Sequence, residues 1–514
     1  MLFNSYIFIL CFLPITWILF FSIAKHSNVG AAFFLFLASL FFYGWWNPLY
    51  VILLLLSSAF NYGISRAILG SSGSPLQKGW LFIGVAGDLA VLCYYKYFAF
   101  LLGIFGLTPP VHATALPLGI SFFTFTQIAF IVDTYRRQAS LTTAVHYGLF
   151  VTYFPHLIAG PLLHHKQIIP QFTSEKMYSP SLENVAVGIT IFVLGLAKKV
   201  IIADGLAPYV GKVFGAANAG VPVDMGEAWL GTLGYTLQIY FDFSGYSDMA
   251  IGISRMFNVI LPANFYSPYQ SLNIIDFWRR WHITLSNFLR DYLYIPLGGN
   301  RKGPFRRYLN VFITMLLGGL WHGAGWTFII WGGLHGVMLM VNHWWRDFLT
   351  RFGLVSVSKT WPVRLASWGL TFFCVVICWV FFRSPTLDSS ITIIRAMFGA
   401  HGLSVPKYMA GFFSGQSGTG WVHFRGFSSN FLLDDIFGIY LGVGLFIALC
   451  MPCIIHIMRT VTPALGLPKQ TAGEGFFPGM TWKPTLGTAI VLALLTIVLL
   501  LLLERPSEFL YFQF

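Results

Sequence analysis

Charged side chains are scarce in this chain of 514 residues. Asp, Glu, Lys and Arg together make up 10% of it, whereas hydrophobic residues make up 56%. Soluble domains carry about 25% charged residues, so the composition excludes an ordinary soluble protein. Together with a mean hydropathy of +0.71, it predicts a polytopic membrane protein whose spans are helices.

Acidic residues are outnumbered by basic ones. The chain has 18 Asp and Glu against 31 Lys and Arg, which leaves a net charge of +13. In a soluble protein this excess would suggest nucleic acid, but in a membrane protein basic residues mark the cytoplasmic loops. We therefore expect no nucleic-acid partner, and we expect the most basic segment to face the cytoplasm. That segment contains Arg279, Arg280, Arg290, Arg301, Lys302, Arg306 and Arg307.

The sequence also gives no indication of a disulfide framework or of a cleavable leader. The six cysteines lie mostly in apolar runs, and the pair Cys450 and Cys453 has no second pair with which to form a zinc site. We interpret the cysteines as small hydrophobic side chains. Residues 1–21 have no basic start and no obvious small-residue cleavage site, so they are expected to form the first span.

Apolar runs along the chain are candidate membrane segments. Several are shorter than the ~20 residues that a straight span needs, so some are expected to be re-entrant, tilted or enclosed, and we expect about 11 to 14 segments. No internal repeat is visible, which predicts one membrane domain over residues 1–514, with a catalytic core at about 117–345. The runs are 5–22, 31–43, 49–64, 80–102, 117–131, 148–160, 186–203, 228–241, 308–320, 326–342, 365–382, 436–457 and 484–503.

The segment 273–294 has the pattern of a helix with one polar and one apolar side. The pattern predicts a single helix at the membrane surface, capped by Asn273 and ending before Pro296. His282 falls on the apolar side and is expected to point toward the protein interior. At ~100° per residue, the polar arc comprises Asp276, Arg279, Arg280, Asn287, Arg290 and Asp291.

A second histidine lies deep in the apolar run that begins near Tyr308. At ~1.5 Å per residue, a helix from Tyr308 carries His322 roughly 20 Å inward. Because the hydrocarbon core is ~30 Å thick, we expect His322 at mid-depth. The surrounding glycines favour close packing or a helix break, and a break at this depth requires an enclosed backbone or a cavity. These glycines are Gly318, Gly319, Gly323 and Gly325.

Common catalytic signatures are absent from the sequence, which has no GxSxG elbow, HExxH, Walker A loop or complete GxGxxG. Catalysis by a histidine side chain is still compatible with the sequence. A neutral buried imidazole can act as the general base for a hydroxyl that attacks a thioester, or it can be a hydrogen-bonded core residue. Spacing alone leaves both interpretations open for His322 and His282. The polar run 244–248 likewise fits either a cavity wall or a helix cap.

Several stretches together resemble the membrane-bound O-acyltransferase family, most closely its bacterial branch that O-acetylates exopolysaccharides such as alginate. The resemblance covers most of residues 1–400 and the terminal FLYFQF, and it is most specific around the two histidines. Those two stretches are DFWRRWHITLSNFLRDYLYIPLGGNRKG (276–303) and LLGGLWHGAGWTFIIWGGLHG (316–336). The others are LPLGISFFTFTQIAFIVDTYR (117–136), YFPHLIAGPLL (153–163), AKKVIIADGLA (197–207) and YFDFSGYSDMAIGI (240–253).

The resemblance implies a fold and a set of catalytic residues. It implies a ring of helices around a thin core crossed by a tunnel, with His322 as the essential histidine and His282 as the second family position. We expect His322 to act as general base and His282 to orient or polarise the acyl group. One departure concerns the segment after Gly160. Relatives often carry an arginine there, whereas this chain has His164, His165 and Lys166, which puts a phosphate or lipid contact in doubt.

The resemblance also implies a donor, a partner and a location. The donor is expected to be cytoplasmic acetyl-CoA, used as a substrate, with no permanently bound cofactor and no metal. The acetyl group would cross the bacterial inner membrane to a periplasmic partner of the SGNH-hydrolase-like type, which modifies alginate or cellulose. Arg279, Arg280, Arg301 and Lys302 are candidates for binding the donor's phosphates, and setting the membrane topology is their alternative role.

Two other classes of function are compatible with the sequence. The chain could be a transporter or flippase of an acetyl carrier or of the glycan, although such proteins often show internal repeats and none is visible here. It could also be a scaffold of a secretion complex. Transfer of a labelled acetyl group distinguishes an enzyme from both.

Overall fold

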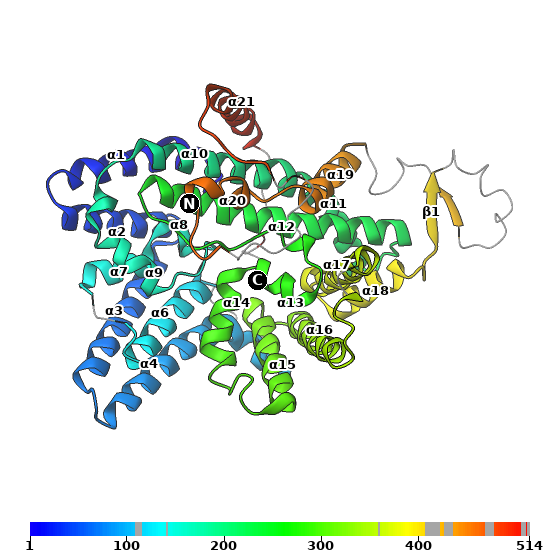
Figure 1. Ribbon diagram of the computed structural model, residues 1–514, viewed down its shortest axis with the longest axis horizontal. Coiled ribbons are helices and arrows are strands. Elements are labelled where there is room, and N and C mark those ends of the chain that lie inside the picture. Colours follow the sequence, from blue (N-terminus) through cyan, green and yellow to red (C-terminus); the bar gives the residue numbers. More distant parts are fainter. Residues whose placement is uncertain are drawn as a thin grey trace.

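The computed structural model describes residues 1–107, 116–139, 142–357, 360–406, 422–425, 435–467, 477, 479–504 and 510. Helices make up most of this part of the chain (Figure 1), which confirms the predicted all-α membrane fold. Among the described residues, the strands are β1 (Leu403–Pro406) and β2 (Val422–Arg425), which pair in parallel. They project beyond the helices at one end of the long axis (Figure 1).

The N-terminal helices form one side of the molecule (Figure 1). Local capping explains where two of them begin, because the side chains of Ser27 and Asn47 each accept a backbone N–H that the first helical turn leaves unpaired. The elements are η1 (Ile7–Phe12), α1 (Leu13–Ala24), α2 (Asn28–Gly44), α3 (Pro48–Gly70), α4 (Leu76–Leu92), η2 (Cys93–Tyr97), α5 (Phe98–Ile104), α6 (Ile120–Tyr135), α7 (Ala144–Thr152), α8 (Phe154–Leu157), α9 (His165–Phe172) and η3 (Glu175–Tyr178).

Helix α12 (Met225–Met256) runs through the centre of the fold and is buried over most of its 32 residues. It packs closely against α10 (Leu182–Ala197) because glycines remove the side chains where the two backbones meet. A Cβ atom on Gly188 would lie 2.5 Å from the carbonyl oxygen of Gly252, so only glycine permits this approach. Next to this crossing lie η4 (Lys198–Ala203) and α11 (Asp204–Asn218).

Three buried carboxylates on or beside α12 are paired with lysines. The Lys199 ammonium lies 2.7 Å from carboxylate oxygens of both Asp204 and Asp242, and the Lys198 ammonium lies 2.6 Å from Asp248. Pairing of this kind offsets the cost of removing charges from water. Asp248 belongs to the polar run 244–248, which lies inside α12. The interpretation of that run as a helix cap is therefore wrong.

The C-terminal half carries the two histidine motifs. Its elements are η5 (Pro268–Gln270), α13 (Ile274–Arg280), α14 (Ile283–Leu289), η6 (Arg290–Tyr294), α15 (Gly303–His322), α16 (Trp326–Arg351), α17 (Trp361–Arg383), α18 (Leu387–Met397), α19 (Asp435–Cys450), α20 (Ile454–Ile457), η9 (Arg459–Val461) and α21 (Leu486–Leu502). In Figure 1, α13 to α16 lie together below the middle of α12.

In the part of the chain that the structure describes, five helical segments are long and apolar enough to cross a membrane. They are Ile7–Ala24, Pro48–Gly70, Leu76–Ile104, Leu182–Asn218 and Trp361–Arg383, and four shorter apolar helices accompany them. Helix α21 is one of these shorter helices, and Leu499 is its one buried residue. An apolar surface of this extent is stable against lipid rather than water. The chain is therefore a membrane protein, while the count of about 11 to 14 segments stays a prediction.

The structure corrects the prediction of a single helix over 273–294. Residues Trp281 and His282 separate α13 from α14, with Trp281 extended and His282 in the left-handed region at a φ of 44°. The predicted polar arc is therefore interrupted, and Arg280 is buried while Arg279 is exposed. The predicted cap is confirmed, because the Asn273 side chain accepts the backbone N–H of Asp276 at 3.0 Å.

Helix α15 begins at Gly303, earlier than the predicted start at Tyr308, and ends at His322. The predicted break occurs at the next residues, where the chain turns through Gly323–Gly325 into α16. The two helices touch through glycine: a Cβ atom on Gly319 would lie 3.0 Å from the Cα atom of Gly332. This contact positions the end of α15 and therefore His322.

Candidate active site

His322 is the last residue of α15 and is 6% exposed. Aromatic rings enclose its imidazole. The ring centroids of Trp321, Trp331 and Phe382 lie 4.8, 5.1 and 5.2 Å away, all in edge-on arrangements. The surroundings favour the neutral imidazole, because burial in an apolar environment disfavours charge. A neutral imidazole can accept a proton.

His282 is fully buried and lies close to His322, with the two ring centroids 6.4 Å apart. The side-chain oxygen of Asn264 accepts both the hydroxyl of Thr284 at 2.9 Å and the Nδ1–H of His282 at 3.0 Å. This bond holds the proton on Nδ1, so that the Nε2 atom of the neutral ring carries a lone pair. The left-handed backbone at His282 is uncommon for a residue other than glycine, and such strain often accompanies functional sites.

Lys96 is a site residue that motif spacing did not identify. Its ammonium donates to the backbone carbonyls of Trp321, at 2.6 Å, and His322, at 3.1 Å. Those carbonyls end α15 and have no partner within the helix, and a cation is favourable at a helix C-terminus. The signal in the sequence is a lysine within an apolar span, which is a functional candidate by default.

Two cavities meet at His322. The first has a volume of about 110 Å³ and is lined by Lys96, Gly119, Ser121, Trp321 and His322, among others. The second is much smaller, about 10 Å³, and is lined by His322, Asp242 and several aromatic side chains, among others. His322 therefore lines both cavities.

The four basic residues proposed for donor binding do not all share one environment. Arg279, Arg301 and Lys302 are exposed. Arg280 is buried, and its Nε atom lies 3.0 Å from a carboxylate oxygen of Asp276. Three of the four are therefore accessible to a soluble ligand, and the fourth is part of the folded interior.

The model of the membrane-bound O-acyltransferase family matches residues 106–382, more than half of the chain. A peptidoglycan O-acetyltransferase from Helicobacter pylori is 41% identical over 79% of this chain and 81% of its own length. A probable alginate O-acetylase from Pseudomonas putida is 38% identical over both full chains. A teichoic acid D-alanyltransferase from Bacillus subtilis is 27% identical over 56% of this chain and 74% of its own length. Both histidines lie within the matched region, and this chain belongs to the membrane-bound O-acyltransferase family and is a membrane-bound acyltransferase.

Proposed function

We propose that the protein takes acetyl groups from cytoplasmic acetyl-CoA and passes them across the bacterial inner membrane for the O-acetylation of a polysaccharide. The observation that carries this proposal is the position of His322, which borders two cavities inside an apolar helical fold and lies 6.4 Å from a second buried histidine. The names of the relatives support polysaccharide acetylation, since they include an alginate O-acetylase and a peptidoglycan O-acetyltransferase.

The chemistry is the transfer of an acetyl group from sulfur to oxygen. The hydroxyl oxygen of the acceptor attacks the thioester carbonyl carbon, the C–S bond breaks, and the thiol leaves. His322 takes the hydroxyl proton as general base and returns it to the leaving sulfur. His282, held by Asn264, orients or polarises the acyl group. Enclosing this site strengthens each electrostatic contact within it.

The exposed basic residues Arg279, Arg301 and Lys302 are suited to attract the phosphates of the donor. Arg280 is less suited, because it is buried beside Asp276. We further propose a periplasmic partner of the SGNH-hydrolase-like type, which receives the acetyl group and modifies the polymer. Alginate is the first candidate polymer and cellulose is the second. The similarity to a peptidoglycan O-acetyltransferase adds peptidoglycan as a third candidate.

The purified protein in lipid vesicles, given acetyl-CoA labelled in its acetyl group, tests this function. With an acceptor hydroxyl present on the opposite side, we expect the label to become covalently attached to that acceptor and free CoA to accumulate on the donor side. Movement of intact labelled donor without CoA release would instead identify a transporter. The sugar composition of the labelled polymer in cells would identify the acceptor.

Replacing Lys96 with Met is expected to lower the acetyl transfer rate by roughly 10- to 100-fold, because a hydrogen bond to a charged group contributes about 1.5–3 kcal/mol. The loss frees the carbonyls of Trp321 and His322 and so loosens the end of α15. The measurement is the transfer rate per amount of protein in membranes. The exposed Lys25, at the end of α1, serves as the control for loss of a lysine charge. Equal rates for Lys25→Met and Lys96→Met would contradict the prediction.

A further inference from the structure

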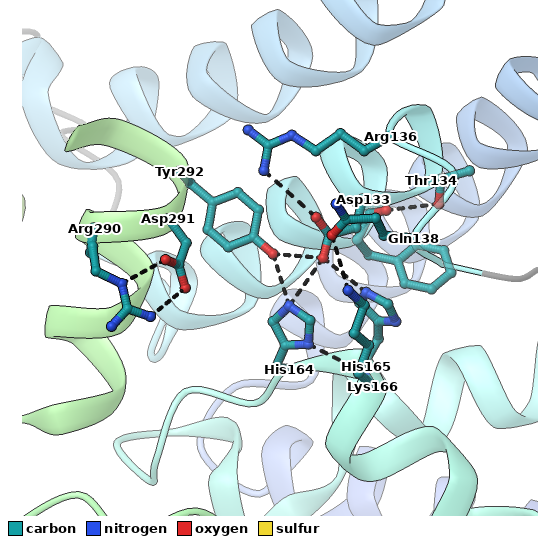
Figure 2. Close-up of polar contacts among 11 residues, drawn as sticks. Asp133, Thr134, Arg136, Gln138, His164, His165, Lys166, Arg290, Asp291 and Tyr292 are labelled. Carbon is teal, nitrogen blue, oxygen red and sulfur yellow. Dashed lines mark hydrogen bonds and ion pairs between the residues drawn. The ribbon is translucent and has the colours of Figure 1, made fainter. Parts of the chain in front are cut away.

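A second cluster of chemically active side chains lies apart from the two catalytic histidines. Figure 2 shows Asp133, His164, His165 and Tyr292 pointing toward one another. Asp133 is near the end of α6, His164 and His165 are at the start of α9, and Tyr292 is in η6. Three elements that are distant in sequence therefore converge on one point.

One carboxylate oxygen is the centre of this cluster. The Nε2 atoms of His164 and His165 each lie 3.0 Å from Oδ2 of Asp133, and the Tyr292 hydroxyl donates to the same oxygen at 2.8 Å. Ligand atoms of the two histidines and Asp133 all lie within 4.8 Å of one another. In a tetrahedral zinc site with bonds of about 2.0–2.2 Å, neighbouring ligand atoms are roughly 3.3 Å apart, so small shifts would admit an ion.

We propose that Asp133, His164 and His165 form a binding site for a divalent transition-metal ion of the zinc type. Two imidazoles and one carboxylate are a ligand set that suits zinc and leaves a fourth position open. Tyr292 is placed to orient the carboxylate from outside the metal's own shell, as hydrogen-bonded neighbours of metal ligands do. The expectation for this sequence is that no metal is bound, and the proposed site departs from it.

The surrounding structure holds the ligands in place. The carbonyl oxygen of Asp133 accepts the backbone N–H of Gln138 at 2.7 Å, which fixes the end of α6. The ring of His165 packs edge-on against Phe130 with centroids 5.6 Å apart. The Arg136 guanidinium lies 3.9 Å from the other carboxylate oxygen, Oδ1. It therefore does not pair with Oδ2, the oxygen that the histidines face.

Metal binding would replace the bonds from Nε2 of both histidines to Asp133. It would also replace the contact of His164 Nε2 with the Tyr292 hydroxyl at 3.0 Å, and it would change one further bond. The Nδ1 atom of His164 accepts the backbone N–H of Lys166 at 3.3 Å. A metal at Nε2 requires the ring proton on Nδ1, so this long bond would be lost. The coordination to the metal replaces it.

An ion can approach the cluster at His164, because a cavity of about 190 Å³ is lined by His164, Tyr292, Asn287 and Thr284, among others. The His164 side chain is 31% exposed, and it faces this space. Thr284 also bonds to Asn264, the partner of His282. One proposed ligand, His164, therefore lines the same cavity as Thr284, which shares the Asn264 side chain with His282.

The test uses the full-length protein in detergent, stripped with a chelator and then given Zn²⁺ alone. We expect about one tightly bound zinc ion per chain, measured by mass spectrometry of the metal after gel filtration. Co²⁺ in place of Zn²⁺ is expected to give the visible absorption of a tetrahedral nitrogen and oxygen site, which Zn²⁺ then displaces. The cobalt spectrum requires no variant, so it remains informative if a variant fails to fold.

Three variants and one control extend the test. Loss of a hydrogen-bonded neighbour costs about 10- to 100-fold in metal affinity, so Tyr292→Phe is expected to weaken Zn²⁺ binding by about that factor. Asp133→Asn and His165→Gln remove a ligand and are expected to cost more than about 100-fold. His146, a half-buried histidine bonded to Thr143 outside the cluster, provides the control His146→Gln, which should bind as the natural protein does. Absence of stoichiometric zinc, or equal zinc binding by all four variants, would overturn the proposal. Asp133 would then be a buried carboxylate that is held by hydrogen bonds and not by a metal ion.

Discussion

Replacing His322 with Ala is expected to abolish polymer acetylation while the protein remains inserted in the membrane at normal abundance. General base catalysis contributes about 10²–10⁴-fold to a rate, and alanine has no group that can accept the proton. Gln at the same position keeps a polar side chain but is not a base, so His322→Gln should be as inactive. The measurements are acetyl content of the polymer, protein abundance in membranes and elution as a single species from gel filtration.

The control for this experiment is a histidine with no contact to the site. His26 lies at the exposed end of α1, and His26→Ala should retain the full acetylation level. Acetylation retained in a folded His322→Ala variant would end the assignment of this residue as the general base. If the His322→Ala protein is absent from the membrane, the assignment is tested with His322→Gln instead, because glutamine preserves more of the side-chain volume.

Substitution of Gly332 by Ala is expected to destabilise the contact between α15 and α16. A Cβ atom at this position would lie 2.4 Å from the carbonyl oxygen of Met315 and 3.0 Å from the Cα atom of Gly319. The obstruction is backbone, which cannot rotate away, so the helices must separate. Overpacking usually costs about 1–3 kcal/mol, and we expect the upper end of that range here. Because α15 ends at His322, acetyl transfer should fall together with the midpoint of thermal unfolding in detergent.

The adjacent glycine is a matched control. A Cβ atom on Gly333 would have Leu316 Cδ1 as its nearest neighbour, at an ordinary contact distance of 3.7 Å. Gly333→Ala makes the same chemical change one residue away in the same helix, and alanine is the better helix former by about 1 kcal/mol. It should unfold at the same temperature as the natural protein or higher. Equal losses in Gly332→Ala and Gly333→Ala would show that the close packing of the two helices is not the cause.

The second histidine shows how far periodic patterns can predict this structure. The apolar side of residues 273–294 correctly placed His282 in the interior, where it is fully buried. The same pattern predicted one continuous helix, whereas the chain turns at Trp281 and His282. No glycine or proline marks that turn. The interior contacts, including the bond from His282 to Asn264, hold a conformation that local preference alone disfavours.

Sequence patterns could not predict the partners of two polar side chains, Lys96 and Asp133, for a similar reason. Lys96 bonds to Trp321, which is 225 residues away in the chain, and Asp133 bonds to Tyr292, which is 159 residues away. A lone lysine or aspartate in an apolar run signals a function without naming its partner. The sequence singled out His164 and His165 as a departure from the family pattern. It did not identify Asp133 as the carboxylate that they face.

The sequence by itself determined the membrane class, the helical architecture, the family and the two histidine motifs, because these depend on composition, near-neighbour periodicity and residue strings that can be recognised in one dimension. Only the tertiary structure decided that His322 ends its helix between two cavities, that Arg280 is buried while Arg279 is not, and that Asp133 meets His164 and His165. Those outcomes depend on which distant surfaces pack together. The free energy of that packing is shared among many side chains and is not carried by any local pattern.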